Sequence, residues 1–303
     1  MSPNDIESQL LYQIVHDVQS PSAYPFVKWA GGKTHLLSKI NAFIPSSFRR
    51  YYEPFLGGGA LFFWLNSSGI RFEAHLSDIN AELINTYKIV KSRVEDLIEV
   101  LKIYEKEYRQ NPLFYYQLRD SAEYSFRNDY VKRAAKFITL NRTCYNGLYR
   151  VNSQGKFNVP MGRYKNPTIC NSNNLRNVSY SLRQSEANIS VRDYKELLYN
   201  KMGEGDFIYL DPPYSPTSRT SSFTGYTNNG FKDKDQEELA NIFKKLDKQG
   251  CKVLLSNSDA ALVKELYSGY SSGIVEIHAL RSINSKATKR SGHKELLIRN
   301  YSL

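Results

Sequence analysis

An acid, two prolines and a tyrosine in a row, Asp211-Pro212-Pro213-Tyr214, form the segment best equipped for chemistry. They follow a short apolar run, residues 207–210, that is typical of a buried strand. Open α/β sheets bind ligands at the edge where such strands end. Because the prolines fix the backbone and lack N–H donors, carbonyl acceptors stand beside the carboxylate. The segment can therefore accept hydrogen bonds from an amino group and stack a ring on it, although a merely rigid turn would have the same sequence.

A second candidate site is the turn Gly57-Gly58-Gly59, between a predicted strand and a predicted helix, with Asp78 at the end of the next strand. In nucleoside pockets such glycines admit the ligand to the backbone, and the acid bonds a ribose hydroxyl. Phe62 stands where the dinucleotide fingerprint needs a small residue. The negative charge of Glu53, just before the turn, favours a cation such as S-adenosylmethionine over a pyrophosphate. A plain glycine-rich turn is the alternative.

The segment Trp29-Ala30-Gly31-Gly32-Lys33-Thr34 has part of the pattern of an ATP phosphate loop. Val27 stands where that loop needs its first glycine, which argues against a nucleotide hydrolase. A tryptophan face beside two glycines can instead border an adenosine, and Lys33 can reach a carboxylate.

Positive charge is unevenly distributed along this chain of net charge +11. No acid occurs from residue 130 to residue 185, and only Glu295 interrupts the basic stretch from 281 to 299. The acid-free interval carries Lys132, Arg133, Lys136, Arg142, Arg150, Lys156, Arg163, Lys165, Arg176 and Arg183. Such a field suits a polyanion and favours nucleic acid over a merely well-solvated basic surface.

Arg, Asn and Tyr residues are concentrated at 141–152 and 157–164, inside the acid-free interval. Arginine reads guanine, asparagine reads adenine, and tyrosine can stack on bases or wedge between them. We therefore expect a base-reading hairpin here. A surface hairpin with an Asn-Gly turn at Asn146-Gly147 is the alternative.

The elements that must position these residues alternate between strand and helix, which predicts an α/β fold. Predicted strands lie near 51–55, 72–78, 187–194, 206–210, 251–256, 274–280 and 295–299, the last two as a closing pair. Predicted helices lie near 60–65, 81–108, 113–120, 130–140 and 234–248, and residues 141–185 read as irregular. The pattern predicts one α/β domain with a basic domain inserted between its halves.

Several classes of protein are disfavoured. Cys144, Cys170 and Cys251 form no Cys-x-x-Cys pair, and the histidines have no metal-ligand spacing, so neither a disulfide framework nor a metal site is expected. No apolar run is long enough to span a membrane, and the acids near the N-terminus do not suit a signal peptide. A cytoplasmic, DNA-associated protein is the expectation.

In sequence and in order, these motifs resemble the DNA adenine-N6 methyltransferases of the Dam/DpnII type. The resemblance covers about residues 25–300 through the blocks FVKWAGGKT, YEPFLGGGALFF, LSDINAELIN, NRTCYNGLYRVN with FNVPMGRYKNP, and DPPY. It implies a Rossmann-like, S-adenosylmethionine-dependent methyltransferase sheet with an inserted DNA-recognition domain, mostly helical with a hairpin. The implied parts are an N-terminal extension at 1–24, a catalytic domain at 25–80 and 187–303, and a target-recognition insert at 81–186.

The resemblance also assigns residues to roles. The implied cofactor site comprises Trp29, Ala30, Gly31, Lys33, Glu53, Phe55, Gly57, Asp78, Asp193 and Asp211. The implied DNA readers are Arg142, Tyr145, Asn146, Leu148, Arg150, Asn152, Asn158, Pro160 and Arg163. Arg150 would read a guanine, and the expected recognition site is GATC in double-stranded DNA.

The implied reaction is methyl transfer to N6 of an adenine flipped out of the duplex. The catalytic set is Asp211, Pro212, Pro213 and Tyr214: Asp211 and the Pro212 carbonyl accept hydrogen bonds from the amine, and Tyr214 stacks on the base. Phe223, Tyr226 or Phe231 would close the other side of the ring, and no metal is required. A cognate restriction endonuclease could act on the same site without a stable complex.

Other functions stay open at this point. An amino methyltransferase acting on RNA or on cytosine N4 is the nearest alternative. The second is a non-catalytic DNA-binding protein that retains a cofactor pocket.

Overall fold

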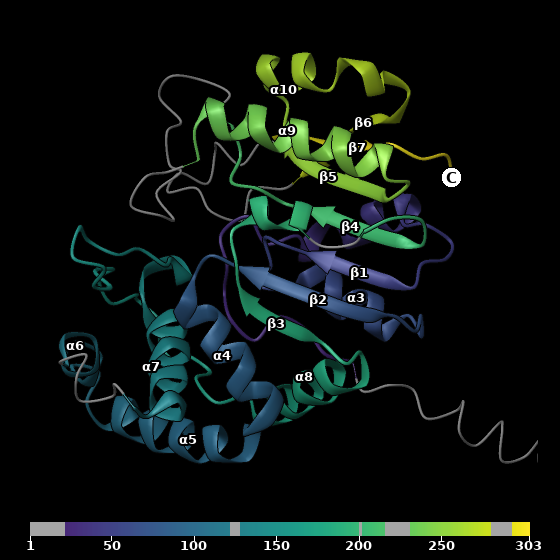
Figure 1. Ribbon diagram of the computed structural model, residues 1–303. Coiled ribbons are helices and arrows are strands. Elements are labelled where there is room, and N and C mark those ends of the chain that lie inside the picture. The colour runs from purple at the N-terminus through teal and green to yellow at the C-terminus, as the bar shows by residue number, and fades with distance from the viewer. Residues whose placement is uncertain (1–21, 122–127, 200–201, 216–230, 280–292) are drawn as a thin grey trace, which may run out of the picture.

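The computed structural model describes residues 22–121, 128–199, 202–215, 231–279 and 293–303. Its centre is a seven-stranded sheet of order β3-β2-β1-β4-β5-β7-β6 (Figure 1). The strands are β1 (Arg50–Glu53), β2 (Glu73–Asp78), β3 (Asn188–Val191), β4 (Asp206–Leu210), β5 (Lys252–Ser258), β6 (Ile274–Ala279) and β7 (His293–Arg299). Among the described strands, β7 runs antiparallel to both β5 and β6, and all other neighbouring strands are parallel. The predicted α/β class is confirmed, and this mixed sheet is consistent with an S-adenosylmethionine-dependent methyltransferase fold.

The order of the strands reverses between β1 and β4. From β1 the chain proceeds to β2 and β3 on one side, and then returns to β4 and β5 on the other. Loops that leave the carboxyl ends of β1 and β4 therefore diverge and open a crevice, where ligands of such sheets bind. Strand β4 is buried along its whole length, as expected for a central strand covered on both faces.

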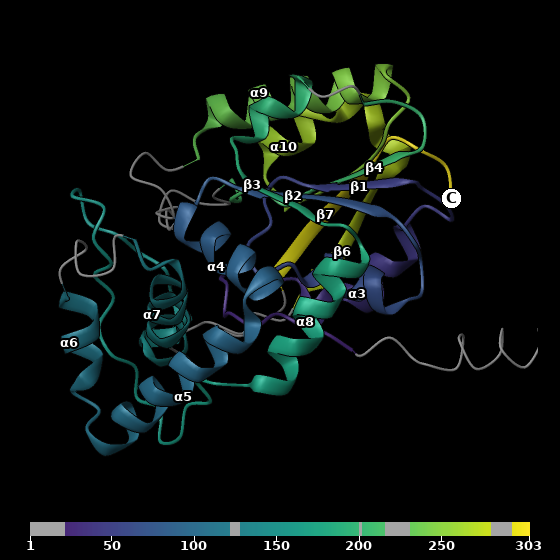
Figure 2. The same ribbon diagram turned by 60° about the horizontal axis from the view of Figure 1, so that its bottom comes forward.

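Helices cover the two faces of the sheet separately (Figures 1 and 2). On one face, α9 (Asp233–Lys248) and α10 (Ala261–Leu266) pack on β4, β5 and β7 through a core that includes Leu239, Phe243 and Leu255. On the other face lie α3 (Ala60–Ser67), α4 (Ala81–Ser92) and α8 (Ser172–Gln184). The loops at the carboxyl edge are thus supported from both faces.

Further helices lie on the outer side of α4, away from the sheet (Figure 2). They are α5 (Val94–Gln110), α6 (Phe114–Asp120) and α7 (Tyr130–Thr143). One hydrophobic core runs from the sheet through α4 to these helices, with Leu76, Tyr87, Leu97 and Ile138 among its members. The boundaries expected for a recognition insert, 81–186, stay a prediction. Two helices within that range, α4 and α8, pack on the sheet side of the core rather than among the outer helices.

The remaining elements are short. They are α2 (Leu37–Ile40) and the 3-10 turns at Thr34–Leu36, Asn41–Phe43, Tyr145–Gly147, Tyr194–Tyr199 and Ser268–Gly273. No helix of the described residues is long and apolar enough to cross a membrane.

The structure corrects three of the predicted elements. The single helix expected over 81–108 is two helices, because the backbone of Arg93 leaves the helical region at φ −139° and ψ 45°. Helix α8 occupies part of the range predicted as irregular; the side chain of Asn171 caps it, and Leu175, Val178 and Leu182 form its buried stripe. Helix α10 was also missed. The other predicted strands and helices are confirmed to within a few residues.

Candidate active site

Three acids meet at the carboxyl edge of the sheet. Glu53 ends β1, Asp78 ends β2, and Asp211 directly follows β4. Because these strands are parallel neighbours, their ends lie side by side. Glu53 and Asp78 are buried, and the side chain of Asp211 is 19% exposed. Strand pairing between β1 and β4 thus brings both Glu53 and Asp211 to this edge.

The glycine-rich turn after β1 is fixed by two hydrogen bonds. The amide of Gly57 donates to Asp78 Oδ2 at 3.0 Å, and the hydroxyl of Tyr87 donates to the Gly57 carbonyl at 3.1 Å. A Cβ at Gly57 would lie 2.6 Å from Cδ1 of Trp29, and its φ of +47° is left-handed. Glycine is therefore required here, because the indole of Trp29 lies directly over the turn.

Burial changes the protonation state of Glu53. Burial is the main cause that raises its pKa to about 8, although a hydrogen bond from the Tyr51 hydroxyl, 2.9 Å from Glu53 Oε2, opposes the rise. At neutral pH this carboxyl is mostly protonated. The standing negative charge expected from the sequence is thus absent until a cation binds beside it and favours the ionised form.

Asp78 has a different environment. Burial raises its pKa, but the amides of Asn80 and Gly57 donate to the two carboxylate oxygens and oppose that rise. Its side chain is thereby held at the turn, and its contact with a ribose stays a prediction.

Lys33 joins the N-terminal segment to the Asp211-Tyr214 segment. Its Nζ lies 2.8 Å from Asp211 Oδ1, donates to the Gly31 carbonyl at 2.7 Å, and stands 4.7 Å from the ring centroid of Tyr214. Burial is the main cause that raises the pKa of Asp211 to about 6, and the Lys33 charge limits the increase. The carboxyl is therefore mostly ionised at pH 7 and titrates just below neutrality.

The two proline carbonyls of this segment differ. Gln236 Nε2 donates to the Pro213 carbonyl at 3.1 Å, and Asn257 Nδ2 holds Gln236 Oε1 at 2.9 Å. Ser258 Oγ donates to the Ser215 carbonyl at 2.7 Å. Among the residues that the structure describes, none donates to the Pro212 carbonyl. The loop is thus anchored by α9 and β5 through its Pro213 and Ser215 carbonyls.

An aromatic cluster borders the site. Phe55 stacks on Tyr194 with ring centroids 5.1 Å apart, and Phe231 lies 6.1 Å from Phe55 and 5.6 Å from Tyr194. Phe231 therefore belongs to the same aromatic wall as Phe55. Phe223 and Tyr226, expected to share its role, lie outside the described residues.

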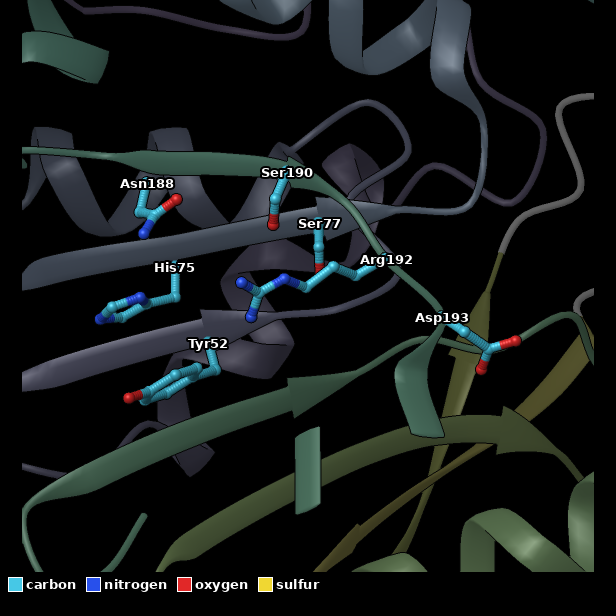
Figure 3. Close-up of a pocket in the computed structure, with 7 residues that line it drawn as sticks. All are labelled: Tyr52, His75, Ser77, Asn188, Ser190, Arg192 and Asp193. Atoms are coloured by element: carbon cyan, nitrogen blue, oxygen red, sulfur yellow. The ribbon is translucent and has the colours of Figure 1, made fainter. Parts of the chain in front are cut away.

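Asp193 is less connected than the other predicted cofactor residues. It lies two residues after β3, and its Oδ1 accepts the Lys195 amide at 3.0 Å. It borders a polar groove on the sheet, lined by Tyr52, His75, Ser77, Asn188, Ser190 and Arg192, but Figure 3 shows its carboxylate pointing away from them. Within the described part of the chain no hydrogen bond or ion pair joins Asp193 to the three acids, so its cofactor role stays a prediction.

The predicted recognition segment follows α7 as a loosely paired hairpin. Isolated bridges join Cys144 to Met161 and Val151 to Phe157. Arg150 lies on its surface, with Nε donating to Asn158 Oδ1 at 2.7 Å. The exposed predicted readers are Tyr145, Asn146, Arg150, Pro160 and Arg163. This exposed set is available to a large ligand.

Other predicted readers have structural partners within the segment. Arg142 Nε donates to the Thr168 carbonyl at 2.9 Å, and burial lowers its pKa. Asn152 Oδ1 accepts the amides of Gln154 and Lys156, both at 3.0 Å, and so closes the turn. Leu148 is half-buried against the core. These side chains shape the segment, and their contact with DNA stays a prediction.

Asn141 is a buried residue that sequence reasoning did not assign to the site. It accepts the Lys28 amide at 2.7 Å and donates to the carbonyls of Lys28 and Gly147 at 2.7 and 3.2 Å. It thereby attaches the recognition segment to the loop residues just before Trp29. Tyr87 and Gln236 were missed as well, because their role depends on contacts between segments distant in sequence. Tyr51 was also missed, although its partner Glu53 lies only two residues along the same strand.

The described residues contain no group of three or more His, Cys, Asp or Glu side chains placed to hold a metal ion. The polar chemistry of the site comes from carboxyls, carbonyls, Lys33 and aromatic rings.

The chain is similar in sequence to known enzymes over most of its length. A family model described as D12 class N6 adenine-specific DNA methyltransferase matches residues 29–283. The type II methyltransferase M.MjaIII of Methanocaldococcus jannaschii is 45% identical over 290 residues, covering 91% of this chain and 99% of the relative. The type II methyltransferase M1.LlaDCHI of Lactococcus lactis subsp. cremoris is 41% identical over 280 residues, covering 91% and 95%. The DNA adenine methylase of Escherichia coli is 36% identical over 275 residues, covering 90% and 93%. The acids, the glycine turn and the Asp211-Tyr214 segment lie at one sheet edge. On the sequence match, the chain belongs to the D12 class of N6 adenine-specific DNA methyltransferases.

Proposed function

We propose that this enzyme methylates the adenine of GATC in duplex DNA, using S-adenosylmethionine as methyl donor and a base flipped out of the helix. The single observation that carries the proposal is the position of Asp211. Its carboxylate contacts Lys33, which also lies 4.7 Å from the Tyr214 ring centroid, at the same sheet edge as Glu53, Asp78 and the Gly57 turn. A nucleobase pocket and a cofactor pocket would thus adjoin.

The cofactor pocket fits a cationic nucleoside. Trp29 covers the Gly57 turn, and Asp78 is fixed at that turn to meet ribose hydroxyls. Glu53 gains charge when a cation approaches, since burial alone keeps it protonated. When bound, S-adenosylmethionine supplies a methyl group activated by the adjacent sulfonium. Trp29, Glu53, Phe55, Gly57 and Asp78 would hold it.

The exocyclic amine of adenine is a weak nucleophile because its lone pair is delocalised into the ring. Its two N–H groups need two acceptors, and Asp211 and the Pro212 carbonyl supply them. When these two acceptors bind both N–H groups, they favour a pyramidal nitrogen. The lone pair of that nitrogen is then directed at the methyl carbon. As the new N–C bond forms, the S–C bond breaks with its electron pair remaining on sulfur, and one amine proton passes to the Asp211 carboxylate or to water. Alignment of the reactants could lower the barrier by about 7 kcal/mol or more.

Lys33 forms an ion pair with Asp211 in the structure. As the amine arrives, Lys33 would move from that carboxylate toward the cofactor. Its Nζ is also bonded to the Gly31 carbonyl and close to Tyr214, so a small rotation suffices to change partners. Tyr214 would stack on the flipped base.

Recognition of GATC would come from the exposed residues of the hairpin, with Arg150 reading a guanine in the major groove. Its hydrogen bond to Asn158 orients the guanidinium before DNA arrives. Two of the relatives carry type II methyltransferase names, which supports a role beside a restriction endonuclease that cuts the same sequence.

The substrate class is tested by labelled methyl transfer from S-adenosylmethionine to matched nucleic acids. The set is a duplex with one GATC, the same duplex with N6-methyladenine in place of both target adenines, a duplex with a single-base change in the site, and an RNA duplex of the same sequence. We expect label only in the first. Label in RNA or on cytosine would overturn the proposed substrate, and cofactor binding without transfer to any of them would indicate a non-catalytic protein.

A further inference from the structure

Glu295 lies on β7, far along the chain from the Asp211-Tyr214 segment. In the sheet it pairs with Ser258 at the carboxyl end of β5. The Tyr214 hydroxyl donates to Glu295 Oε2 at 2.6 Å, a short hydrogen bond to an acidic group. Hydrogen bonds to charged partners are the stronger ones, so this contact can fix the position of a ring.

The bond determines which way the Tyr214 ring faces. Backbone contacts fix the residues around it, since Gln236 holds the Pro213 carbonyl and Ser258 holds the Ser215 carbonyl. Neither of these bonds acts on the phenol ring itself. Lys33 stands 4.7 Å from the ring centroid and contacts Asp211. The phenol hydroxyl is therefore held by Glu295, with the Asp211 carboxyl close to the same hydroxyl and Lys33 near the ring.

We propose that Glu295 is a positioning residue for methyl transfer: it holds the Tyr214 ring in the orientation that stacks on the flipped adenine. The inference rests on the proposed function of Tyr214. It goes beyond that function because it assigns a role to a side chain outside the Asp211-Tyr214 segment, on the antiparallel strand of the sheet.

The test compares Glu295→Ala, Glu295→Gln, Tyr214→Phe and the double variant Tyr214→Phe with Glu295→Ala. Loss of the bond in Glu295→Ala should lower kcat by about tenfold to a hundredfold, the range for a hydrogen bond to a charged group, with a smaller change in KM for DNA. Glu295→Gln keeps an oxygen acceptor and should restore most of kcat. The double variant should lose no more than the worse single variant, because both changes remove one bond.

Two readouts separate positioning from a merely structural role. A duplex with 2-aminopurine at the target adenine reports stacking of the flipped base, and its fluorescence in the complex should differ between Glu295→Ala and the unmodified enzyme. The acidic limb of the kcat/KM profile should move to lower pH in Glu295→Gln, since the Glu295 charge raises the pKa of Asp211 against the opposing charge of Lys33. Glu276→Gln on β6, an exposed Glu paired with Lys294, is the matched control and should change neither.

Tyr214→Ala distinguishes failure of the inference from failure of the function. If Tyr214→Ala loses activity while folded Glu295→Ala keeps it, Glu295 has no positioning role and the function of Tyr214 stands. If Tyr214→Ala itself retains full activity, the stacking role fails, and the Glu295 inference fails with it. Additive losses in the double variant, or a Glu295→Gln variant as impaired as Glu295→Ala, would also overturn the inference.

Discussion

At the scale of single residues, burial decides how each carboxyl at the sheet edge can act. Glu53 and Asp211 lie at the ends of neighbouring strands, yet burial raises the pKa of one to about 8 and of the other only to about 6. The difference arises from Lys33, which contacts Asp211 and favours its ionised form. One acid is thus ready to accept hydrogen bonds at pH 7, and the other becomes charged on binding a cation.

Replacing Asp211 should abolish turnover without abolishing cofactor binding. Asp211→Asn retains the shape but loses the charge, and we expect kcat to fall by about a hundredfold or more, as when one preorganised electrostatic group is lost from a site. Steady-state methylation kinetics and calorimetry of S-adenosylmethionine binding measure the two effects. Asp120→Asn, an exposed acid paired with Arg119, is the control. A folded Asp211→Ala variant with substantial turnover would contradict the assigned role.

Glu53 should release a proton when S-adenosylmethionine binds at neutral pH. The free carboxyl has a pKa near 8 and the cation lowers it, so affinity should rise as pH increases toward 8 and level off above it. Calorimetry in two buffers of different ionisation heat measures the proton count. Glu53→Gln should bind the cofactor more weakly and release fewer protons. The difference in proton release between the two proteins removes the contribution from ionisation of the cofactor itself. Equal proton release in both proteins would rule out this role of Glu53.

At the scale of elements, sequence patterns locate the strands and the loops that follow them. The apolar run before Asp211 predicts β4 correctly, because a strand buried on both faces leaves a continuous apolar sequence. Strand β2 is predicted by its alternating pattern, in which every second residue is buried and the last is Asp78. Helix α8 was missed because its apolar residues are sparse and lie among polar ones. The break at Arg93 was missed because no glycine or proline marks it.

The contacts that complete the site could not be predicted in this way. Lys33 meets Asp211, Tyr87 meets the Gly57 carbonyl, and Glu295 meets Tyr214, in each case across a long stretch of chain. Such pairs depend on strand order and loop direction, which periodicity does not encode. The resemblance to a family named the cofactor and DNA residues, but it did not indicate the protonation of Glu53 or the attachment of the hairpin through Asn141.

The glycine turn gives a prediction at this scale. Gly57→Ala forces a Cβ to within 2.6 Å of Trp29 at a left-handed φ, so the indole must move from the cofactor pocket. We expect S-adenosylmethionine affinity to fall by at least about tenfold, with a stability loss beyond the roughly 1–2 kcal/mol of left-handed strain. Gly69 has a φ of +76° and open space around an added Cβ. Gly69→Ala is therefore the control that shows the effect of backbone strain alone. Equal cofactor affinities in the two variants would show that Trp29 does not cover the pocket.

At the scale of the whole molecule, the catalytic edge and the basic segment are connected rather than independent. Asn141 ties the hairpin to residue 28, next to Trp29, and a continuous core runs from the sheet to α7. A DNA molecule held by the hairpin would therefore be presented to a site of defined geometry. Positive charge in the acid-free interval should supply most of the salt-dependent affinity.

Arg150 and Lys156 should affect DNA binding in different ways. Arg150→Ala should relax discrimination at one guanine by about 1–3 kcal/mol. Lys156 is exposed and is not an expected base reader, so Lys156→Ala should weaken all DNA alike and reduce the salt slope by about one. Binding to GATC and to single-base variants at several salt concentrations measures both. Arg109→Ala on α5, whose exposed side chain pairs with Glu105, controls for loss of charge. Loss of affinity without loss of discrimination in Arg150→Ala would assign it to the phosphates.

The central claim is tested most directly by sequence-resolved methylation of a plasmid after incubation with the purified enzyme and S-adenosylmethionine. The account predicts N6-methyladenine at GATC and at no other sequence, with none produced by Asp211→Asn. N6-methyladenine at a different sequence would retain the chemistry but contradict the assigned readers on the hairpin. No methylated base, from a folded enzyme that binds its cofactor, would contradict the account of the site itself.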